Sequence, residues 1–331
     1  MANISMYREE FKEEVKEIIG YKTGLNIQDE EIIKFLDDDS IKLWSGNSEA
    51  IRFRPEEYEH IVHSILLNVG YTERDSPYIS SRNIIMKYYD DELKFNILQQ
   101  VLLLRNKWWK REIDRCLKNG DKKINPIPFI KDAYNRYGEI GRELAVEIIF
   151  DQMEYENCSP WNNVRRIEWK NIIDLKDLFQ SEGLETLYGS FIDQRYINYL
   201  SKNFENDIDS INWRKFEAIT CEYFERNGYY VEIGQGRNDG GIDARIWSKD
   251  ESKENSPTIL VQCKRQKRNV ESVVVKALYA DVYNEYAKSG LIVTSTKISP
   301  SGKAFAKTAR GFKINFCERD TLRKWIEEMR C

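Results

Sequence analysis

The sequence predicts two kinds of structure in one chain: a mostly α-helical N-terminal region and an α/β C-terminal domain with a mixed central sheet. Through about residue 205 the apolar residues recur at helical spacing, and from Asn212 onward helical and alternating segments follow one another. Charge divides in the same way, because residues 211–331 hold 22 Lys+Arg and 16 Asp+Glu, whereas residues 1–210 hold 29 and 39. Such asymmetry is compatible with a nucleic-acid-binding module joined to a second component. We therefore predict two domains, residues 1–205 and 211–331.

Composition excludes several classes of protein. Of the 331 residues, 41% are hydrophobic and 32% charged, and no window approaches the roughly 18 uninterrupted apolar residues of a membrane span. The N-terminus lacks the apolar core of a signal peptide, so we expect a cytoplasmic protein. The six cysteines are scattered without a Cys-x-x-Cys pair, which favours free thiols. His60 and His63 share one face of a predicted helix, but no third ligand stands near them in sequence, so a zinc site is disfavoured.

The N-terminal region is expected to consist of helices joined by polar loops. A helix begins near Pro55 and ends at Gly70, since proline suits a first helical turn and glycine a helix end. A long helix covers Leu93 to Leu117, and Asn119-Gly120-Asp121 with the following prolines marks a loop. Further helical stretches cover about 134–152 and Phe191 to Leu200. The role of this region is open: targeting, regulation or assembly.

One segment of the long helix interleaves basic and aromatic residues, as single-strand nucleic-acid binders do: Arg105-Asn106-Lys107-Trp108-Trp109-Lys110-Arg111. The alternative is a packed helix whose tryptophans are buried while its charges reach solvent. Because the preceding leucine-rich run already requires burial, we favour packing.

The C-terminal domain alternates helix and strand. Asn212 caps a helix that Gly228 ends, and Ser299-Pro300 opens a later helix. The other elements are expected at these positions: strands at Tyr229–Ile233, Ile242–Trp247, Ile259–Lys264, Leu291–Thr294 and Ile314–Cys317, a helix from Asn269 or Val270 to about Ser289, and a last helix carrying Leu322, Trp325, Ile326 and Met329.

Polar residues with chemical potential lie on two of these strands. Gln262 and Lys264 point to the same face of one strand, and Asp243 can lie beside them if that strand pairs with the preceding one. A carboxylate, the Gln262 amide oxygen and the backbone carbonyl of Cys263 are hard oxygen ligands suited to Mg²⁺. Lys264 adds a cation able to orient or deprotonate an attacking water, and Glu217 supplies a further carboxylate at the rim.

The order of these motifs resembles that of the Mrr-type restriction endonucleases, which belong to the PD-(D/E)xK nuclease group. It runs Phe216-Glu217, Gly228-Tyr229, Asp239-Gly240-Gly241-Ile242-Asp243, Val261-Gln262-Cys263-Lys264-Arg265 and Ile292-Val293-Thr294, over about residues 213–328. The resemblance implies a restriction-endonuclease-like fold and a metal-dependent deoxyribonuclease, usually concerned with foreign or modified DNA.

By that resemblance Asp243 is the central metal ligand, Lys264 the catalytic lysine and Glu217 the helix carboxylate. Gln262 stands where the broad group has an acidic residue, although it suits the Mrr branch. The implied cofactor is Mg²⁺, with Mn²⁺ able to substitute. Each feature has a plainer interpretation: residues 239–241 as a turn, Lys264 as part of a solvated basic run, Cys263 as a small buried apolar residue, and Glu217 as an exposed helix acid.

DNA is the expected partner. The basic residues after the Gln-x-Lys strand and around the following helix are placed to meet phosphates: Arg265, Lys267, Arg268, Lys297, Lys303 and Lys307. Phosphate contacts carry no sequence information, so target choice is assigned to the N-terminal region. We also expect a homo-oligomer, or another protein subunit bound through the acidic region. The alternative function is a catalytically inactive nuclease-fold DNA-binding module, or a subunit of a larger defence complex.

Overall fold

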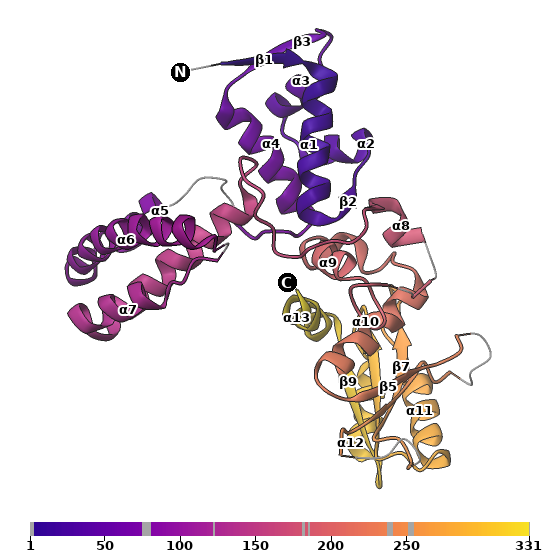
Figure 1. Ribbon diagram of the computed structural model, residues 1–331. Helices are drawn as coiled ribbons and strands as arrows, with labels where there is room; N and C mark the ends of the chain where they lie inside the picture. The colour runs from indigo at the N-terminus through magenta and orange to yellow at the C-terminus, as the bar shows by residue number, and fades with distance from the viewer. Residues whose placement is uncertain are drawn as a thin grey trace. The chain divides into compact units, whose positions relative to one another are not determined.

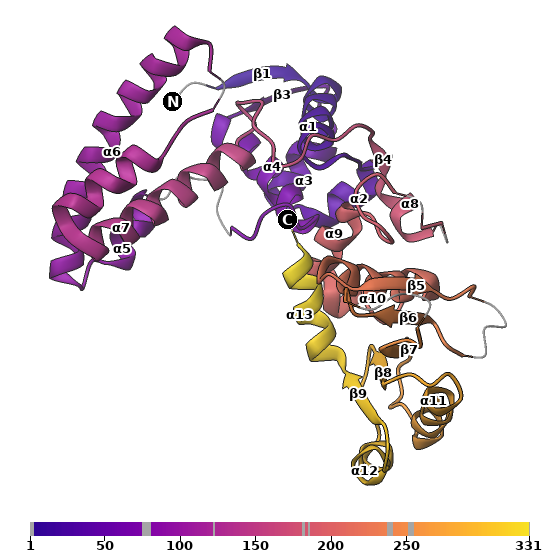
Figure 2. The same cartoon turned by 60° about the horizontal axis from the view of Figure 1, so that its bottom comes forward.

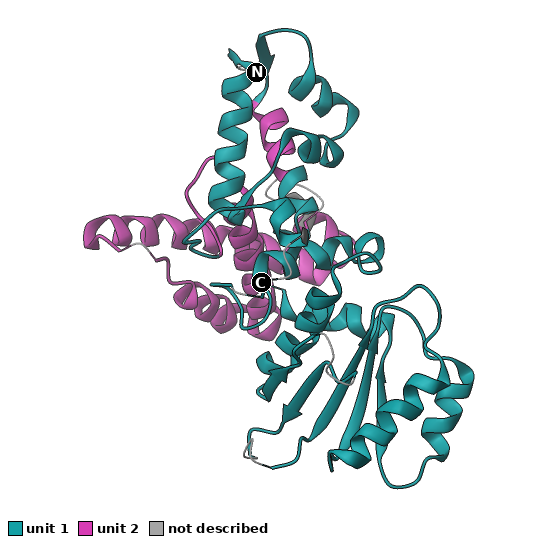
Figure 3. Ribbon diagram, turned by 90° about the vertical axis from the view of Figure 1, so that its right-hand side faces the viewer, with its two compact units in different colours: residues 1–54, 64–73, 167–331 teal, residues 55–63, 74–166 magenta. Residues whose placement is uncertain are grey.

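The computed structural model describes residues 3–74, 81–121, 123–180, 183–184, 186–236, 241–250 and 255–330. The chain forms two compact units, each built from separated stretches of sequence (Figure 3). Unit 1 comprises Met1–Arg54, Ser64–Glu73 and Ile167–Cys331, and unit 2 comprises Pro55–His63 and Arg74–Arg166. A domain boundary between residues 205 and 211 stays a prediction. Among the described residues, no helix combines the length and apolarity needed to cross a membrane.

Unit 2 is helical, as predicted. Its main elements are α5 (Ser81–Lys87), α6 (Glu92–Asn119) and α7 (Ile127–Cys158), drawn in magenta tones in Figure 1. Trp108 of α6 is buried and stacks on Phe129 of α7 with ring centroids 5.2 Å apart, and the Arg105 guanidinium lies over the Trp109 ring. Packing is therefore the role of Trp108.

Helix α7 differs from the predicted stretch at 134–152. It begins at Ile127, because the prolines that were interpreted as loop markers stand in its first turn, where a missing N–H costs nothing. Gly138 interrupts it with a non-helical backbone (φ 61°, ψ −149°). Helix α4 (Pro55–Asn68) follows the prediction, and the buried His63 ring lies 2.8 Å from the Arg74 carbonyl oxygen.

The first part of unit 1 contains two short strand pairs that were not predicted. Strand β1 (Ile4–Tyr7) pairs antiparallel with β3 (Ala50–Phe53), and β2 (Leu25–Asn26) pairs parallel with β4 (Ile173–Asp174). Buried Phe11 lies edge-on to Trp44 and Phe53, which ties the helices to the β1–β3 pair. The helices of this part are α1 (Arg8–Thr23), α2 (Asp29–Ile32), the 3-10 helix η1 (Ile33–Phe35) and α3 (Asp38–Ser45).

The C-terminal part of unit 1 contains a five-stranded mixed sheet of order β5-β6-β7-β8-β9. Its first two pairings are antiparallel and its last two parallel, which confirms the predicted α/β fold with a mixed sheet. The strands are β5 (Tyr230–Ile233), β6 (Ala244–Trp247), β7 (Ile259–Lys264), β8 (Ser289–Thr294) and β9 (Lys313–Cys317). The helices are α10 (Trp213–Arg226), α11 (Ser272–Asn284), α12 (Pro300–Thr308) and α13 (Arg319–Met329).

Helices cover both faces of this sheet, and strand alternation decides which side chains meet them (Figure 2). Leu260 and Ile292 pack with α11 residues such as Leu278 in an apolar cluster that Phe305 of α12 adjoins. The opposite face of β7 carries Cys263, whose thiol lies 3.6 Å from the Thr220 hydroxyl of α10. Gln262 and Lys264 therefore occupy the α11–α12 face.

Helix caps in this domain follow the predictions, but α11 is shorter than predicted. The Asn212 side chain accepts from the Arg214 N–H, and Ser299 accepts from the Gly302 N–H. Val270, predicted to begin α11, instead forms a parallel bridge with Ile298 and uses its backbone groups there. At the other end, Ser289 belongs to β8 rather than to the helix.

Two further helices, α8 (Leu175–Gln180) and α9 (Gln194–Asp207), precede the sheet. Helix α9 starts and ends later than the predicted stretch Phe191 to Leu200. It lies against the C-terminal helix, since the Gln194 amide donates to the Met329 carbonyl at 3.1 Å. Gly70 ends the segment after α4 with φ 73°, and a side chain there would collide with the Asn198 carbonyl. Helix α9 thus contacts both α13 and the segment after α4.

Candidate active site

Asp243 is held at the start of β6 by the backbone of β7. Its own N–H donates to the Val261 carbonyl at 2.9 Å, and its Oδ2 accepts from the Cys263 N–H at 2.6 Å. A backbone N–H bonded to a carboxylate is a strong hydrogen bond that fixes the carboxylate's position. The side chain is buried, and it joins the two strands that sequence pairing predicted to be neighbours.

Gln262 lies next to that anchor in the centre of the sheet. It is 7% exposed, and its Oε1 has no hydrogen-bond partner within the described ranges. An amide oxygen buried without a partner costs on the order of 1–3 kcal/mol, so this atom fits a site that a ligand completes. Gly241 lies against the Gln262 amide, because a Cβ there would be 3.1 Å from Nε2, and its φ of 89° favours glycine.

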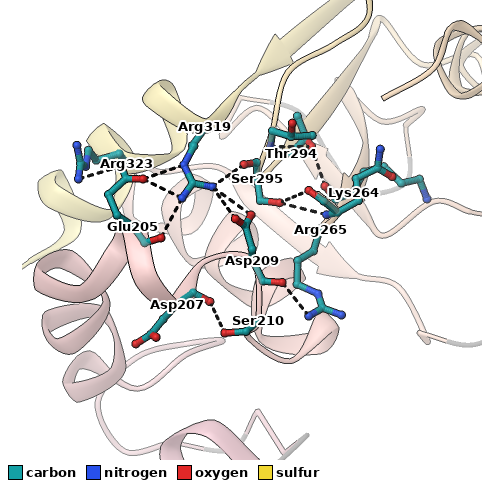
Figure 4. A network of polar contacts seen from close by, with 12 residues as sticks. Glu205, Asp207, Asp209, Ser210, Lys264, Arg265, Thr294, Ser295, Arg319 and Arg323 are labelled. Carbon is teal, nitrogen blue, oxygen red and sulfur yellow. Dashed lines mark hydrogen bonds and ion pairs between the residues drawn. The ribbon is translucent and has the colours of Figure 1, made fainter. Parts of the chain in front are cut away.

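Lys264 ends β7 and is partly exposed. Its register partner on β8 is Thr294, whose buried hydroxyl donates to the Lys264 carbonyl at 2.7 Å (Figure 4). Side chains two apart on a strand share a face, so Lys264 points to the same side as Gln262. The structure thus places Asp243, Gln262 and Lys264 on one pair of adjacent strands.

Glu217 approaches this group from α10. It is buried rather than an exposed helix acid, and its Oε2 is 2.9 Å from Arg214 Nη1. Burial raises the pKa of the Cys263 thiol well above its usual value, and the charges of Asp243 and Glu217 add to this shift. Both carboxylates therefore lie near that thiol. Glu217 lies with Thr220 on α10, the helix that the Cys263 side chain faces.

The raised thiol pKa and the contact with Thr220 both favour a packing role for the Cys263 side chain. A thiol that stays protonated at neutral pH is a poor nucleophile. Its side chain contacts Thr220 across the sheet, and burial has the same effect on the pKa of the neighbouring Cys221 thiol. Cys263 therefore packs as a small apolar residue, and only its backbone carbonyl is a candidate ligand.

The oxygen atoms of this site suit a hard divalent cation. The described ranges contain no group of three or more His, Cys, Asp or Glu placed to hold a metal. Magnesium needs fewer protein ligands than zinc or calcium, since it keeps several waters and is bound by one or two carboxylates together with substrate phosphates. The Asp243 carboxylate and the unsatisfied Gln262 oxygen match that requirement.

The basic residues fall into two groups. Lys267, Arg268 and Lys297 are exposed, and the Val270 N–H donates to the Lys297 carbonyl at 2.9 Å, which brings their two loops together. Lys307 is exposed on α12, the helix that covers the face of Gln262 and Lys264. These cations are free to approach phosphates from that side.

Two of the predicted phosphate contacts already have protein partners. Lys303 pairs with Glu318 at 2.8 Å. Burial raises the pKa of the Glu318 carboxyl, but hydrogen bonds from Lys303 and from the Ile298 N–H hold it below its usual value. The Arg265 guanidinium donates to the Asp209 carbonyl at 3.3 Å. These pairings reduce what either side chain offers to DNA. Asp239 and Gly240 of the predicted motif lie outside the described residues.

Comparison with known proteins decides the family of the C-terminal part. A family model described as a restriction endonuclease, with an Mrr catalytic domain, matches residues 208–326. Residues 208–326 are a restriction endonuclease domain. This confirms the resemblance seen in the order of the sequence motifs. Enzymes of this family generally use divalent metal ions.

The comparisons of the whole chain with solved structures and with curated proteins add no further argument about its function. The structure of the MspJI restriction endonuclease in complex with a 27-mer oligonucleotide matches with 16% identity and a TM-score of 0.28, over 60% of this chain and 40% of that one. The chain therefore spans less than half the length of that protein. No curated protein matches.

Sequence reasoning did not find several residues that organise the endonuclease domain. Arg214, the partner of Glu217, and Arg319, which bonds to the Ser295 carbonyl at 3.0 Å, were not singled out. For Ser295 a signal existed, because polar residues just after the carboxyl end of a parallel strand often border a site. For Arg214 the i,i+3 spacing to Glu217 on the predicted helix was such a signal, whereas the local sequence gave none for Arg319.

Proposed function

We propose that this protein is a Mg²⁺-dependent DNA endonuclease that hydrolyses phosphodiester bonds. One observation carries the proposal: in a domain of the restriction endonuclease family, the Asp243 carboxylate is bonded to the β7 backbone next to Gln262, two residues before Lys264, and the buried oxygen of Gln262 has no hydrogen-bond partner in the described part of the chain. A carboxylate, an unsatisfied amide oxygen and a lysine on adjacent strands are what metal-assisted phosphodiester hydrolysis requires.

The residues take distinct parts in this mechanism. Asp243, Gln262 and the Cys263 carbonyl would hold the cation, which supplies charge neutralisation at the phosphate and lowers the pKa of a water. Lys264 orients the attacking water and offsets charge that develops on the phosphate oxygens. Glu217 contributes a second carboxylate near Asp243, with Arg214 holding it in place. Lys267, Arg268, Lys297 and Lys307 bind the DNA backbone.

The test uses substitutions that remove charge but keep shape. Asp243→Asn retains an acceptor for the Cys263 N–H while losing the charge that holds a cation, and Lys264→Gln removes the ammonium. Each is expected to lower Mg²⁺-dependent cleavage of plasmid DNA by about 100-fold or more, the usual scale for such groups. The exposed Asp250→Asn and Lys276→Gln are matched controls that should cleave like the parent.

The outcomes separate the proposal from its rival. Cleavage by both site variants at the parental rate would remove these residues from catalysis. If the parent binds DNA but does not cut it with Mg²⁺ or Mn²⁺, the chain is a nuclease-fold binding module instead. Thermal unfolding of every variant checks that lost activity is not lost folding.

Three broader expectations accompany the proposal: a role in defence against foreign DNA, a cytoplasmic location, and assembly as a homo-oligomer or with another protein subunit. Assembly has support in unit 2, where large apolar side chains are exposed on α6 and α7. Leu103 and Leu117 on α6 and Phe150 on α7 are each more than half exposed. Exposed apolar surface of this kind marks interaction sites. Sedimentation of the purified chain tests this expectation.

A further inference from the structure

One arginine ties the end of α9 and the residues just after it to the central sheet of the endonuclease domain (Figure 4). From α13, Arg319 Nε and Nη2 donate to the Glu205 carboxylate at 3.1 and 2.8 Å, and Nη1 donates to both Asp209 oxygens at 3.1 Å. Nη1 also donates to the Ser295 carbonyl at 3.0 Å. Each nitrogen of the guanidinium is therefore engaged. We call Arg319, Glu205, Asp209, Ser295 and Thr294 the Arg319 network.

The network continues to the strand that carries Lys264. The buried Ser295 hydroxyl accepts from the Gln266 N–H at 3.1 Å and donates to the Gln266 carbonyl at 3.0 Å. Next to it, the Thr294 hydroxyl donates to the Lys264 carbonyl at 2.7 Å. The β7–β8 ladder ends at the pair Lys264 and Thr294, so these side-chain bonds extend the joint beyond the last strand pair. The position of the end of β8 therefore influences the position of Lys264.

The two acids lie at the C-terminal end of α9 and just after it. Glu205 is in the last turn of α9, and Asp209 follows the helix. Asp209 also reaches the residue after Lys264, since its carbonyl accepts from Arg265 at 3.3 Å. Asp209 is therefore connected to the end of β7 in two ways: through Arg319 and Ser295, and through Arg265.

Arg323 provides an internal comparison. It lies one turn further along α13 and pairs with Glu205 at 3.1 Å. The guanidinium groups of Arg319 and Arg323 each lie 5.4 Å from the centre of the Phe204 ring. Within the described ranges, Arg323 makes no polar contact with β8. The two arginines therefore share charge, helix and the acidic partner Glu205, whereas Arg319 alone of the two also bonds to Asp209 and to Ser295.

We propose that Arg319 is a positioning residue for the nuclease reaction: it joins Glu205 and Asp209, at the end of α9 and just after it, to the end of β8 and thereby fixes the end of β7 that bears Lys264. The inference rests on the proposed function. Small displacements of a catalytic group are costly, since a shift of about 1 Å can lower a rate by about 100-fold. A route from α9 to Lys264 also gives the N-terminal region a physical path to the site.

The experiment compares Arg319→Gln with Arg323→Gln in the full-length chain. Cleavage of plasmid DNA with Mg²⁺ is measured at a temperature below the unfolding range of every variant. Arg319→Gln is expected to lower kcat by about 10- to 100-fold with KM changed less than about threefold, because Lys264 is misplaced while DNA contacts remain. Arg323→Gln should keep the parental kcat. Equal kcat values for the two variants overturn the proposal.

A double substitution tests whether Arg319 acts through Ser295. If both belong to one connection, Arg319→Gln combined with Ser295→Ala lowers kcat no further than the more damaging single change. Multiplied losses in kcat would show two independent effects and would contradict the proposed route. A merely structural role predicts a lower melting temperature with parental kcat per folded molecule.

Hydrogen exchange at the Gln266 amide separates this inference from the proposed function. Exchange there is expected to be at least about tenfold faster in Arg319→Gln than in Arg323→Gln, because the Ser295 acceptor is no longer held. Unchanged protection overturns the connection itself. If the parent does not cleave DNA, the proposed function and the catalytic part of this inference both fall, while the exchange measurement still decides whether Arg319 holds the strand end.

Discussion

At the scale of single residues, the buried polar groups of the endonuclease domain differ in how completely they are satisfied. Glu222 is 2% exposed, and its carboxylate accepts from the backbone N–H groups of Ser190, Phe191 and Ile192 and from Arg226. A carboxylate with that many donors is a structural anchor that fixes a loop. Gln262 is buried to a similar degree but leaves its oxygen unsatisfied within the described ranges. The contrast separates a group used for folding from one available to a ligand.

The basic residues give a prediction at this scale. Replacing Lys267 and Arg268 together with Ala should weaken DNA affinity by a similar factor for unrelated sequences. The slope of log affinity against log salt should fall by about 1.8, since each lost phosphate contact contributes about 0.9. Lys303→Ala is the matched control, because its ammonium is paired with Glu318 and has less to offer a phosphate. Fluorescence anisotropy across a salt series measures the slopes.

An unchanged slope in the double variant would remove these residues from the DNA interface. A slope change for Lys303→Ala as large as that of a free cation would show that its pairing with Glu318 opens when DNA binds.

These cases show what sequence can predict about the site. Strand alternation predicts that Gln262 and Lys264 share one face, and the pairing of β6 with β7 brings Asp243 to the Cys263 backbone. The partners of Lys303 and Arg265 could not be assigned from spacing. These two contacts join residues 15 and 56 positions apart, which no local rule connects.

At the scale of elements, the same limit applies to helix ends. Asparagine and serine caps predicted α10 and α12 correctly, since a cap acts within a few residues. Helix α11 was overextended because the bridge between Val270 and Ile298 claims the backbone of its expected first turn. The β1–β3 pair was missed because its partners are about 45 residues apart in sequence, too far for a hairpin signal.

Helix α9 gives a prediction for its N-terminal cap. Asp193 accepts from the Arg195 N–H at 2.9 Å and from the Arg195 guanidinium at 2.7 and 2.8 Å. Burial raises the pKa of Asp193, but these bonds, with one from Thr186, hold it below its usual value. Asp193→Asn keeps a good cap and removes the charge, so we expect a loss on the order of 2 kcal/mol in the free energy of unfolding at pH 7.

The pH dependence follows from the lowered pKa. The charged form stabilises the fold fully above the unfolded value of about 4, and this stabilisation is lost as pH falls through the lower folded pKa. The difference between parent and Asp193→Asn should therefore shrink in acid, as urea unfolding at several pH values can show. The exposed Asp90→Asn is the control. A difference that stays constant down to pH 2 would assign the effect to packing instead of charge.

At the scale of the whole molecule, the segment before the endonuclease domain is part of the fold that surrounds the site. Besides the Arg319 network, the Met329 carbonyl accepts from both Gln194 and Arg226, which fastens α13 to α9 and α10. The family match begins at residue 208, after α9. A chain that starts at the family boundary therefore lacks contacts that the end of the domain uses.

Two shortened chains, residues 190–331 and 210–331, test what this segment and the remaining N-terminal part do. The shorter one loses Glu205, Asp209 and the whole of α9, so it should melt at a lower temperature and cut DNA more slowly than residues 190–331.

The longer one keeps the Arg319 network but loses most of the acidic charge of residues 1–210, which exceeds its basic charge by ten. If that charge competes with DNA phosphates at low ionic strength, residues 190–331 should cut faster and less selectively than the full chain, and added salt should reduce the difference. Thermal unfolding establishes that each chain is folded before rates are compared on the same plasmid. Equal rates and equal selectivity for residues 190–331 and the full chain would contradict restraint by charge and leave the N-terminal part a targeting or assembly region.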